Sequence, residues 1–187
     1  RRRCNILLRQ SLCQNVCSTH FDSSLCTREP LGRFRANSAI GKEGDIMDLE
    51  ERIMELSRYG YACGQILAIL LLDTIGEENP ALVRCMQGLN GGIGSSGDVC
   101  GCMAAGCCLI SYFTGKPADD EFDSPHHKGA MGEFTSWFHD EMELEYMGYD
   151  CSQIVGTNPA KKVQYCPGII ASTYEKCMEI LENRGLL

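Results

Sequence analysis

The sequence predicts an all-α fold, a compact bundle of five to six helices with a glycine-rich loop before a cysteine-rich helix. Apolar side chains recur three and four residues apart in several segments between residues 48 and 182, which is the spacing of amphipathic helices. Glycine or proline stands at most boundaries between these segments, as helix ends require. We find no segment with the strict alternation of apolar and polar residues that is typical of a half-buried strand.

The first half of the bundle is expected to hold three helices. Residues 48–59 form an amphipathic helix, in which apolar residues three or four apart are separated by acidic ones. Residues 61–75 are apolar on nearly all sides, so this helix should lie at the centre of the bundle. Asn79 and Pro80 provide a cap and a proline at the first helical position for a third helix over residues 81–89.

The second half is expected to add three longer helices. The cysteine-rich helix starts from Asp98, its expected N-cap, and runs to about Phe113. Residues 126–147 form a long amphipathic helix with several aromatic residues on its apolar side. The last helix covers residues 168–182 and begins after Pro167.

Composition narrows the classes of protein. The formal net charge is −8 over 187 residues, which argues against a nucleic-acid partner. The longest apolar run, Ile66–Leu72, is far too short to span a bilayer, so no membrane partner is expected. Arg1–Arg3 resemble the start of a signal peptide, but too few apolar residues follow, and we expect none.

Thirteen cysteines far exceed the usual frequency and allow two interpretations. One is a secreted scaffold held by disulfides, and the other is an intracellular thiol or metal protein. We favour the second, because the cysteines lie within apolar helical patterns and the chain is large enough to fold without disulfide bonds. A cytoplasmic location is therefore expected.

Residues 1–46 differ from the rest of the chain. They contain no methionine and no sustained periodicity, and Met47 stands immediately before the first clear helix. Residues 42–45 can be encoded by a purine-rich run that resembles a bacterial ribosome-binding site. We expect residues 1–46 to be a non-native or disordered N-terminal extension and residues 47–187 to form the helical redox domain. The intact mass of the protein from its native host tests this expectation.

Gly91–Cys108 is the segment that most strongly suggests chemistry. A loop of glycines and serines leads into four closely spaced thiols, Cys100, Cys102, Cys107 and Cys108. If Asp98 caps the helix, Cys100 lies in the first turn, where the helix N-terminus favours a thiolate, although the Asp98 charge opposes this effect. The alternative is that these cysteines are small apolar residues that only pack. Four such residues together favour a functional role.

Helix geometry limits what these four thiols can do alone. Cys100 and Cys107 share a helix face but stand roughly 10 Å apart along its axis, which is too far for a disulfide in an intact helix. A site must therefore use thiols from other segments, and the candidates are Cys63, Cys151 and Cys166. Four thiolates from separate segments suit an iron–sulfur cluster or zinc, and a pair of disulfides is the alternative.

The remaining motifs favour structural interpretations. Gly92–Gly97 matches the pattern GxGxxG, but a helical segment precedes it, so we interpret it as a flexible loop and not as a dinucleotide site. Cys85 and Cys177 lie on apolar stripes and are expected in the core. Three histidines could bind a metal but are expected on the surface, namely His126, His127 and His139.

Several of these segments together resemble a known family. Tyr61–Gln65, Gly91–Gly94 leading into Cys100-Gly101, and then Cys151 and Cys166 resemble the redox-active proteins named for the pattern C_GCAxxG_C_C. The resemblance covers about residues 50–183. It implies a small helical, cytoplasmic protein of a kind found mostly in anaerobic bacteria and archaea, with an activity inferred from its cysteines. A related module of the split-Soret cytochromes is similar, and an iron–sulfur cluster has been proposed there.

The resemblance also implies four signature cysteines, which fall on Cys63, Cys100, Cys151 and Cys166. If the core of the motif is taken as Cys-Gly-Ala-x-x-Gly and starts at Cys100, Cys102 stands in place of the alanine and Ala105 in place of the last glycine, with Gly106 next. The additional thiols are candidates for an extended site, namely Cys102, Cys107 and Cys108.

Three functions are consistent with these observations. The first is an electron-transfer protein in which the four signature cysteines hold an iron–sulfur cluster or another metal, with a separate redox partner protein. The second is thiol–disulfide exchange without any metal, with Cys100 as the attacking thiolate and Cys63 as the resolving thiol. The third is an accessory module whose cysteines are structural. A homo-oligomer is compatible with all three.

Overall fold

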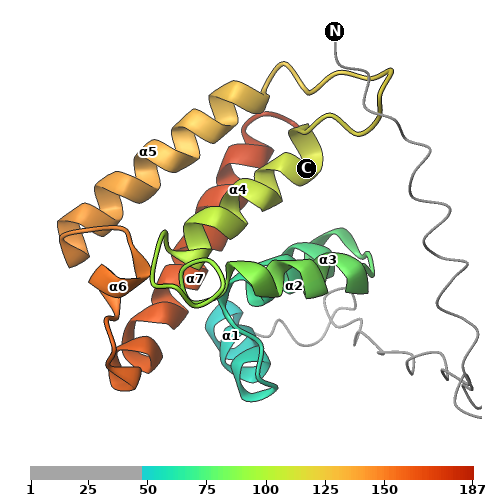
Figure 1. Ribbon diagram of the computed structural model, residues 1–187. Coiled ribbons are helices and arrows are strands. Elements are labelled where there is room, and N and C mark those ends of the chain that lie inside the picture. Colours follow the sequence, from blue (N-terminus) through green and yellow to red (C-terminus); the bar gives the residue numbers. More distant parts are fainter. Residues whose placement is uncertain (1–47) are drawn as a thin grey trace, which may run out of the picture. The chain divides into compact units, whose positions relative to one another are not determined.

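The computed structural model describes residues 48–187. It contains seven α-helices and one short 3-10 helix (Figure 1): α1 (Leu49–Arg58), α2 (Cys63–Ile75), α3 (Pro80–Met86), η3 (Gln87–Leu89), α4 (Gly101–Thr114), α5 (His127–Tyr146), α6 (Cys151–Ile154) and α7 (Pro159–Glu182). These described residues form no strand, and the predicted all-α bundle is confirmed. The prediction for residues 1–46 concerns a segment that lies outside the described residues.

Helix α4 connects the two halves of the bundle. It contacts α2 on one side and α5 and α7 on the other (Figure 1). The core between these helices is apolar, and its largest members have at most 1% of their surface exposed, for example Leu67, Leu109, Phe134 and Ile180. Burying side chains of this size contributes roughly 1.5–3 kcal/mol each, so this core is the main source of stability.

The junction between α2 and α3 follows the predicted signals. Gly76 adopts a left-handed conformation with φ of +69° and ends α2, a conformation that costs glycine little. The side chain of Asn79 accepts a hydrogen bond from the N–H of Leu82 at 3.0 Å, and Pro80 is the first helical residue. The cap and the proline therefore act as their residue types predict.

The start of α4 differs from the prediction that Asp98 is its N-cap. The carbonyl oxygen of Asp98 accepts a hydrogen bond from the N–H of Cys151 at 2.8 Å, and its carboxylate accepts one from the hydroxyl of Ser96 at 2.7 Å. These bonds hold Asp98 outside the helix, and Cys100 is the N-cap. Cys100 is therefore the residue before the first turn, and Cys102 lies within that turn.

The start of α7 was also predicted wrongly, because the helix begins at Pro159 and contains Pro167 in its interior. Asn158 caps this earlier start by accepting a hydrogen bond from the N–H of Ala160 at 3.0 Å. Pro167 has no N–H to donate to the carbonyl group of Val163. Since Val163 is exposed, water can hydrate that carbonyl group, and the helix continues through the proline.

Ion pairs join the helices at the surface. Arg52 on α1 binds Asp73 on α2 at 2.8 Å. On the other side, Glu133 of α5 binds Arg184 at 2.6 Å and Lys176 of α7 at 3.4 Å. Such pairs contribute at most about 1 kcal/mol each. Across residues 48–187, no helix is long and apolar enough to cross a membrane.

Candidate functional site

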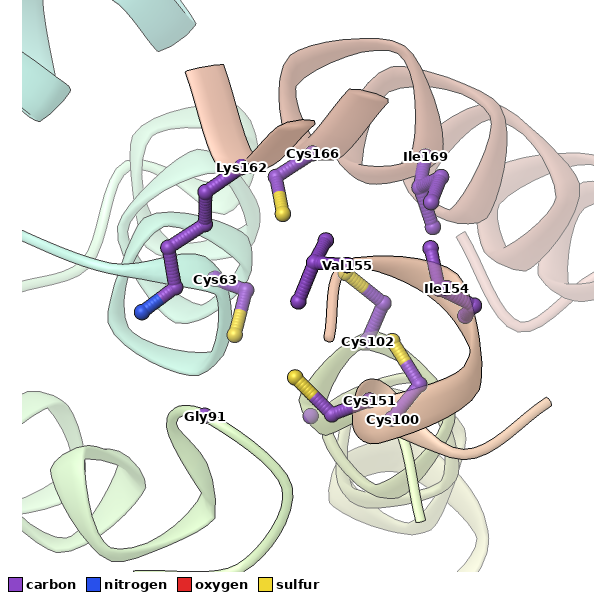
Figure 2. Close-up of a pocket in the computed structure, with 11 residues that line it drawn as sticks. Cys63, Gly91, Cys100, Cys102, Cys151, Ile154, Val155, Lys162, Cys166 and Ile169 are labelled. Carbon is purple, nitrogen blue, oxygen red and sulfur yellow. The ribbon is translucent and has the colours of Figure 1, made fainter. Parts of the chain in front are cut away.

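Five cysteines line one small cavity, and they come from four separate segments of the chain (Figure 2). Cys63 is the first residue of α2, Cys100 is the N-cap of α4, and Cys102 lies in its first turn. Cys151 is the first residue of α6, and Cys166 lies within α7. The cavity has a volume of about 20 Å³, which is close to the space that one water molecule needs. We call these five residues the cysteine cluster.

A short pairing of two loops brings Cys100 and Cys151 to the same place. Val99 and Asp150 form an isolated antiparallel bridge. Around it, the N–H of Cys100 donates to the carbonyl oxygen of Tyr149 at 3.1 Å, and the N–H of Cys151 donates to that of Asp98 at 2.8 Å. The starts of α4 and α6, far apart in sequence, are therefore tied together by backbone hydrogen bonds.

Asn90 positions the start of α2 from outside the helix. The residue before this helix is Ala62, whose side chain cannot cap it. The side-chain oxygen of Asn90 instead accepts a hydrogen bond from the N–H of Gly64 at 2.9 Å, while its amide group donates to Gln65 at 3.2 Å. The thiol of Cys63 also lies 3.6 Å from the same Asn90 oxygen. A loop residue thus replaces the missing cap and contacts the cluster.

Two glycines allow the elements around the cluster to approach each other closely. A Cβ atom on Gly101 would lie 2.5 Å from the carbonyl oxygen of Leu89 and 2.7 Å from the sulfur of Cys63. A Cβ atom on Gly92, whose φ is +76°, would lie 2.5 Å from the carbonyl oxygen of Asp98. Both positions need a residue without a side chain, so these glycines are part of the architecture of the site.

Three neighbouring thiols of the cluster differ in the direction in which their pKa values are shifted. The hydrogen bond from Cys102 is the main cause that lowers the pKa of Cys63 to about 6, and backbone N–H groups of Gly91 and Gly64 act in the same direction. The pKa of Cys100 is also lowered, again mainly by Cys102. The pKa of Cys102 is raised, because it is the shared donor and is fully buried. Cys102 therefore favours the protonated form, whereas Cys63 and Cys100 favour the thiolate form more than a free thiol does.

The other two members of the cluster are less acidic. Burial raises the pKa of Cys151 and raises the pKa of Cys166 to about 12, and the neighbouring thiolates add to both shifts. Lys162 opposes these shifts through its positive charge. It also lines the cavity (Figure 2). No carboxylate lines this cavity, and apart from the thiols Lys162 is the one ionisable residue in its lining.

The remaining predicted candidates lie outside the cluster. Cys107 and Cys108 do not line the cavity, and Cys108 is exposed. Cys177 is buried, as predicted for the core, and its thiol donates to the carbonyl oxygen of Gly106 at 3.7 Å. Cys85 was predicted in the core as well, but it is exposed, because the stripe on which it lies belongs to the short helix α3 at the edge of the bundle.

The donor chemistry of the cluster suits a soft metal, whereas its geometry is not that of an assembled ligand set. Thiolates are preferred ligands of zinc and of iron–sulfur clusters. Within residues 48–187, however, no three histidine, cysteine or acidic side chains are arranged so that they could hold a metal ion. The five thiols are thus gathered in one place but are not closed around a common point. A multi-iron cluster would require these side chains to turn and the cavity to widen.

The comparison with protein families agrees with this concentration of thiols. Residues 61–180 match the model of a family described as "Putative redox-active protein (C_GCAxxG_C_C)". The chain belongs to this family. The matched C_GCAxxG_C_C region contains all five residues of the cysteine cluster. No curated protein and no solved structure matches the chain.

The name C_GCAxxG_C_C can be placed on the chain in a second register. Gly101–Gly106 reads GCMAAG, which keeps both glycines of GCAxxG and changes only its alanine, to Met103. In this register the motif cysteine is Cys102, whereas in the register that starts at Cys100 it is Cys100. The structure gives both glycines a steric role, because a Cβ atom on Gly106 would lie 2.7 Å from an atom of the Phe134 ring.

Sequence reasoning missed Asn90 and Lys162. Neither residue lies in a recognisable motif, and each reaches the cluster only through the folding of the chain. The local signals for Cys102 were its position among closely spaced thiols and the match of Gly101 and Gly106 to the two glycines of GCAxxG.

Proposed function

We propose that this redox-active protein uses the cysteine cluster to hold a metal–sulfur centre, an iron–sulfur cluster by preference, that exchanges electrons with a separate partner protein. The observation that carries the proposal is the convergence of five thiols from four segments on one cavity without any carboxylate. A dithiol couple needs only two cysteines, whereas an iron–sulfur cluster commonly uses four.

The surroundings of the thiols support metal binding. Metals bind the thiolate form, and the pKa values of Cys63 and Cys100 are both lowered. Cys63 and Cys100 each stand at the start of a helix of thirteen or fourteen residues, where the helix dipole favours a negative charge. When bound, the metal centre would supply one-electron chemistry. The protein would supply the thiolates, the apolar burial and the backbone N–H group of Gly91.

The placement of the cysteines also supports a reducing compartment. The cysteines of the cluster lie in helices or at their starts in a bundle with its own apolar core, and clustered cysteines in such a protein are more typical of metal binding or catalysis in the cytosol than of a disulfide scaffold. We therefore include a cytoplasmic location in the proposal.

Anaerobic purification of the full chain tests this function. Iron, zinc and acid-labile sulfide are measured together with the visible spectrum, first on the wild type and then on a Cys→Ser variant at each position of the cluster. We expect iron with sulfide in the wild type and its loss in the variants at ligand positions. Cys85→Ser and Cys108→Ser serve as controls, because both cysteines are exposed and lie outside the cluster.

A colourless, metal-free wild type would contradict the metal centre. So would retention of iron in all five cluster variants. Zinc without iron would replace the redox centre by a structural metal site.

Thiol–disulfide exchange is the second candidate, because the pKa values of Cys63 and Cys100 are both lowered. The pKa of Cys63 is lowered to about 6, so we assign the attacking role to Cys63 and the resolving role to Cys100, the reverse of the roles predicted from the sequence. The thiolate of Cys63 would attack a partner disulfide and release one partner sulfur as a thiolate. The thiolate of Cys100 would then attack the mixed disulfide and release the second sulfur, so that the partner gains two electrons and the protein gains one disulfide.

Thiol counting distinguishes the two candidates. In a metal-free protein, exchange chemistry predicts that oxidation removes two thiols reversibly and that either Cys63→Ser or Cys100→Ser prevents this loss. A protein with neither metal nor a reversible dithiol would leave only a structural role for the cysteines.

A further inference from the structure

A second and larger cavity lies beside the cysteine cluster. It has a volume of about 640 Å³, which falls within the range of small-molecule binding sites. It shares four residues with the small cavity, namely Gly91, Cys151, Val155 and Lys162. We call this larger cavity the cleft. Because the two cavities share part of their walls, a molecule in the cleft would lie next to the cluster.

The walls of the cleft suit an anion. Lys162 is the one charged residue among those that line it, and the rest of the lining is formed mainly by glycine, serine, threonine and asparagine residues. The nearby carboxylate of Asp98 does not line the cleft and accepts a hydrogen bond from the hydroxyl of Ser96 at 2.7 Å. The chain has a formal net charge of −8, so a cleft lined by one positive charge and no acidic residue is a local exception that favours a negatively charged ligand.

The loop on one side of the cleft contributes hydroxyl groups, because the backbone N–H groups of residues 93–97 already donate to the carbonyl groups of residues 88–93. Gly91, Gly94 and Gly97 have positive φ angles of +68°, +64° and +85°, so the chain turns repeatedly through this segment. Ser95 and Ser152 add hydroxyl groups on opposite elements of the wall. Hydroxyl groups donate hydrogen bonds to carboxylate and phosphate oxygens.

Cys151 is the point at which the cleft reaches the cluster. Among the nine cysteines of residues 48–187, it alone lines both cavities. It is partly buried, and its backbone is fixed by the hydrogen bond to Asp98. A molecule bound against Lys162 would therefore contact the Cys151 thiol, whereas the other four thiols of the cluster do not line the cleft.

We infer that the cleft is a binding site for a small organic anion with a carboxylate or phosphate group, which Lys162 and the Gly91–Gly97 loop hold against the Cys151 thiol. The inference that an anion binds depends only on the residues of the cleft. The further inference that this anion is the redox substrate of the protein rests on the proposed function.

Two alkylating reagents that differ in charge test this inference on the full chain, after reduction and removal of metal with a chelator. Iodoacetate is an anion and iodoacetamide is neutral, and both react with a thiolate by displacing iodide. The ratio of their rates at one cysteine therefore cancels the fraction of thiolate. Mass spectrometry gives this ratio for Cys151 and, in the same molecule, for the exposed thiol of Cys108, which lies outside the cleft.

We expect the iodoacetate-to-iodoacetamide ratio to be higher at Cys151 than at Cys108, and the iodoacetate rate at Cys151 to saturate with concentration as binding requires. Lys162→Gln should lower the Cys151 ratio roughly fivefold, the effect of one nearby surface charge. Lys162→Arg should retain it. Lys161→Gln is the matched control. Lys161 is the preceding residue in the sequence and carries the same charge, but it does not line the cleft.

Competition identifies the anion class. At constant ionic strength, inorganic phosphate and succinate are each added, and protection of Cys151 without protection of Cys108 supports the site. The stronger competitor then assigns the phosphate or the carboxylate group.

Equal ratios at the two cysteines would overturn the inference. An equal effect of Lys162→Gln and Lys161→Gln, with both variants as helical as the wild type by circular dichroism, would also overturn it. These outcomes are independent of metal analysis, so failure of the cleft and failure of the metal centre can be told apart.

Discussion

The backbone N–H of Cys100 donates a hydrogen bond to the carbonyl oxygen of Tyr149 at 3.1 Å. This bond joins the N-cap of α4 to the loop before α6, and the Val99–Asp150 bridge lies beside it. Two cysteines that are fifty-one positions apart in the numbering, Cys100 and Cys151, are thereby held on one cavity. The site depends on this loop pairing as much as on the helices.

Gly92→Ala should disrupt that loop pairing. A Cβ atom at this position would lie 2.5 Å from the carbonyl oxygen and 2.7 Å from the amide nitrogen of Asp98. Gly94→Ala is the matched control, because its φ is also positive but nothing lies within 4 Å. Both variants should lose about 1 kcal/mol of unfolding free energy from the left-handed backbone. Gly92→Ala should lose about 1–3 kcal/mol more from the clash. Urea unfolding that gives equal losses would contradict this prediction.

Gly106→Ala should destabilise the bundle, whereas Gly132→Ala should stabilise it. A Cβ atom on Gly106 would lie 2.7 and 2.9 Å from two ring atoms of Phe134 and closer still to a third. We expect a loss of about 1–3 kcal/mol from overpacking. Gly132 is exposed within α5 and has open space around it, so alanine there should gain about 0.5–1 kcal/mol in helix propensity. Thermal unfolding measures both, and a shift of the same sign in the two variants would refute the steric role of Gly106.

Cys102→Ala should make Cys63 less acidic. In the metal-free wild type, the rate of alkylation of Cys63 should rise with pH around a midpoint near the pKa of about 6, because only the thiolate reacts. Removal of the Cys102 donor raises this pKa toward its usual value, so the midpoint moves to higher pH. The rate at pH 7 should then fall by about tenfold.

Cys102→Ser provides the control for that experiment, because a hydroxyl group can still donate to the Cys63 sulfur. Mass spectrometry of the alkylated peptide follows the reaction across pH. The same midpoint in the wild type and both variants would show that Cys102 does not set the acidity of Cys63.

Asn90→Ala should affect both the stability of the bundle and the reactivity of Cys63. It removes the hydrogen bond to the N–H of Gly64 at 2.9 Å and the contact with the Cys63 thiol. We expect a loss of about 1 kcal/mol of unfolding free energy, as for removal of a helix cap. We also expect the rate of Cys63 alkylation to differ from that of the wild type. Asn79→Ala should lose a similar free energy by removing the cap of α3 but leave the Cys63 rate unchanged. Equal Cys63 rates in the wild type and in both variants would argue against a positioning role for Asn90.

The helices could be predicted from the sequence because their signals are local. Apolar spacing, the left-handed glycine at residue 76 and the Asn79–Pro80 cap all act within a few residues, and the structure agrees with each of them. The two wrong helix starts have different causes. Asp98 is held outside α4 by a bond to Cys151, a distant partner that local patterns do not show. Pro167 lies within α7 because the carbonyl group that it leaves unpaired belongs to an exposed turn.

The cluster could be predicted only in part. The need for thiols from separate segments and the resemblance to the C_GCAxxG_C_C family directed attention to Cys63, Cys100, Cys151 and Cys166, and the structure places all four on one cavity. The sequence could not show which of the additional thiols line the cavity, because this depends on which face of α4 is turned toward α2, α6 and α7. Cys102 faces the cavity, whereas Cys107 and Cys108 do not.

The four segments of the cluster extend from the first residue of α2 to the middle of α7, so the site exists only when nearly the whole bundle is assembled. Any ion held by these thiols would bind the folded chain and not the unfolded one, and its binding free energy would add to the stability of the fold. A chelator would then lower the free energy of unfolding, while the apolar core keeps the metal-free chain folded. Loss of the metal would therefore be measured as a lower midpoint of urea unfolding.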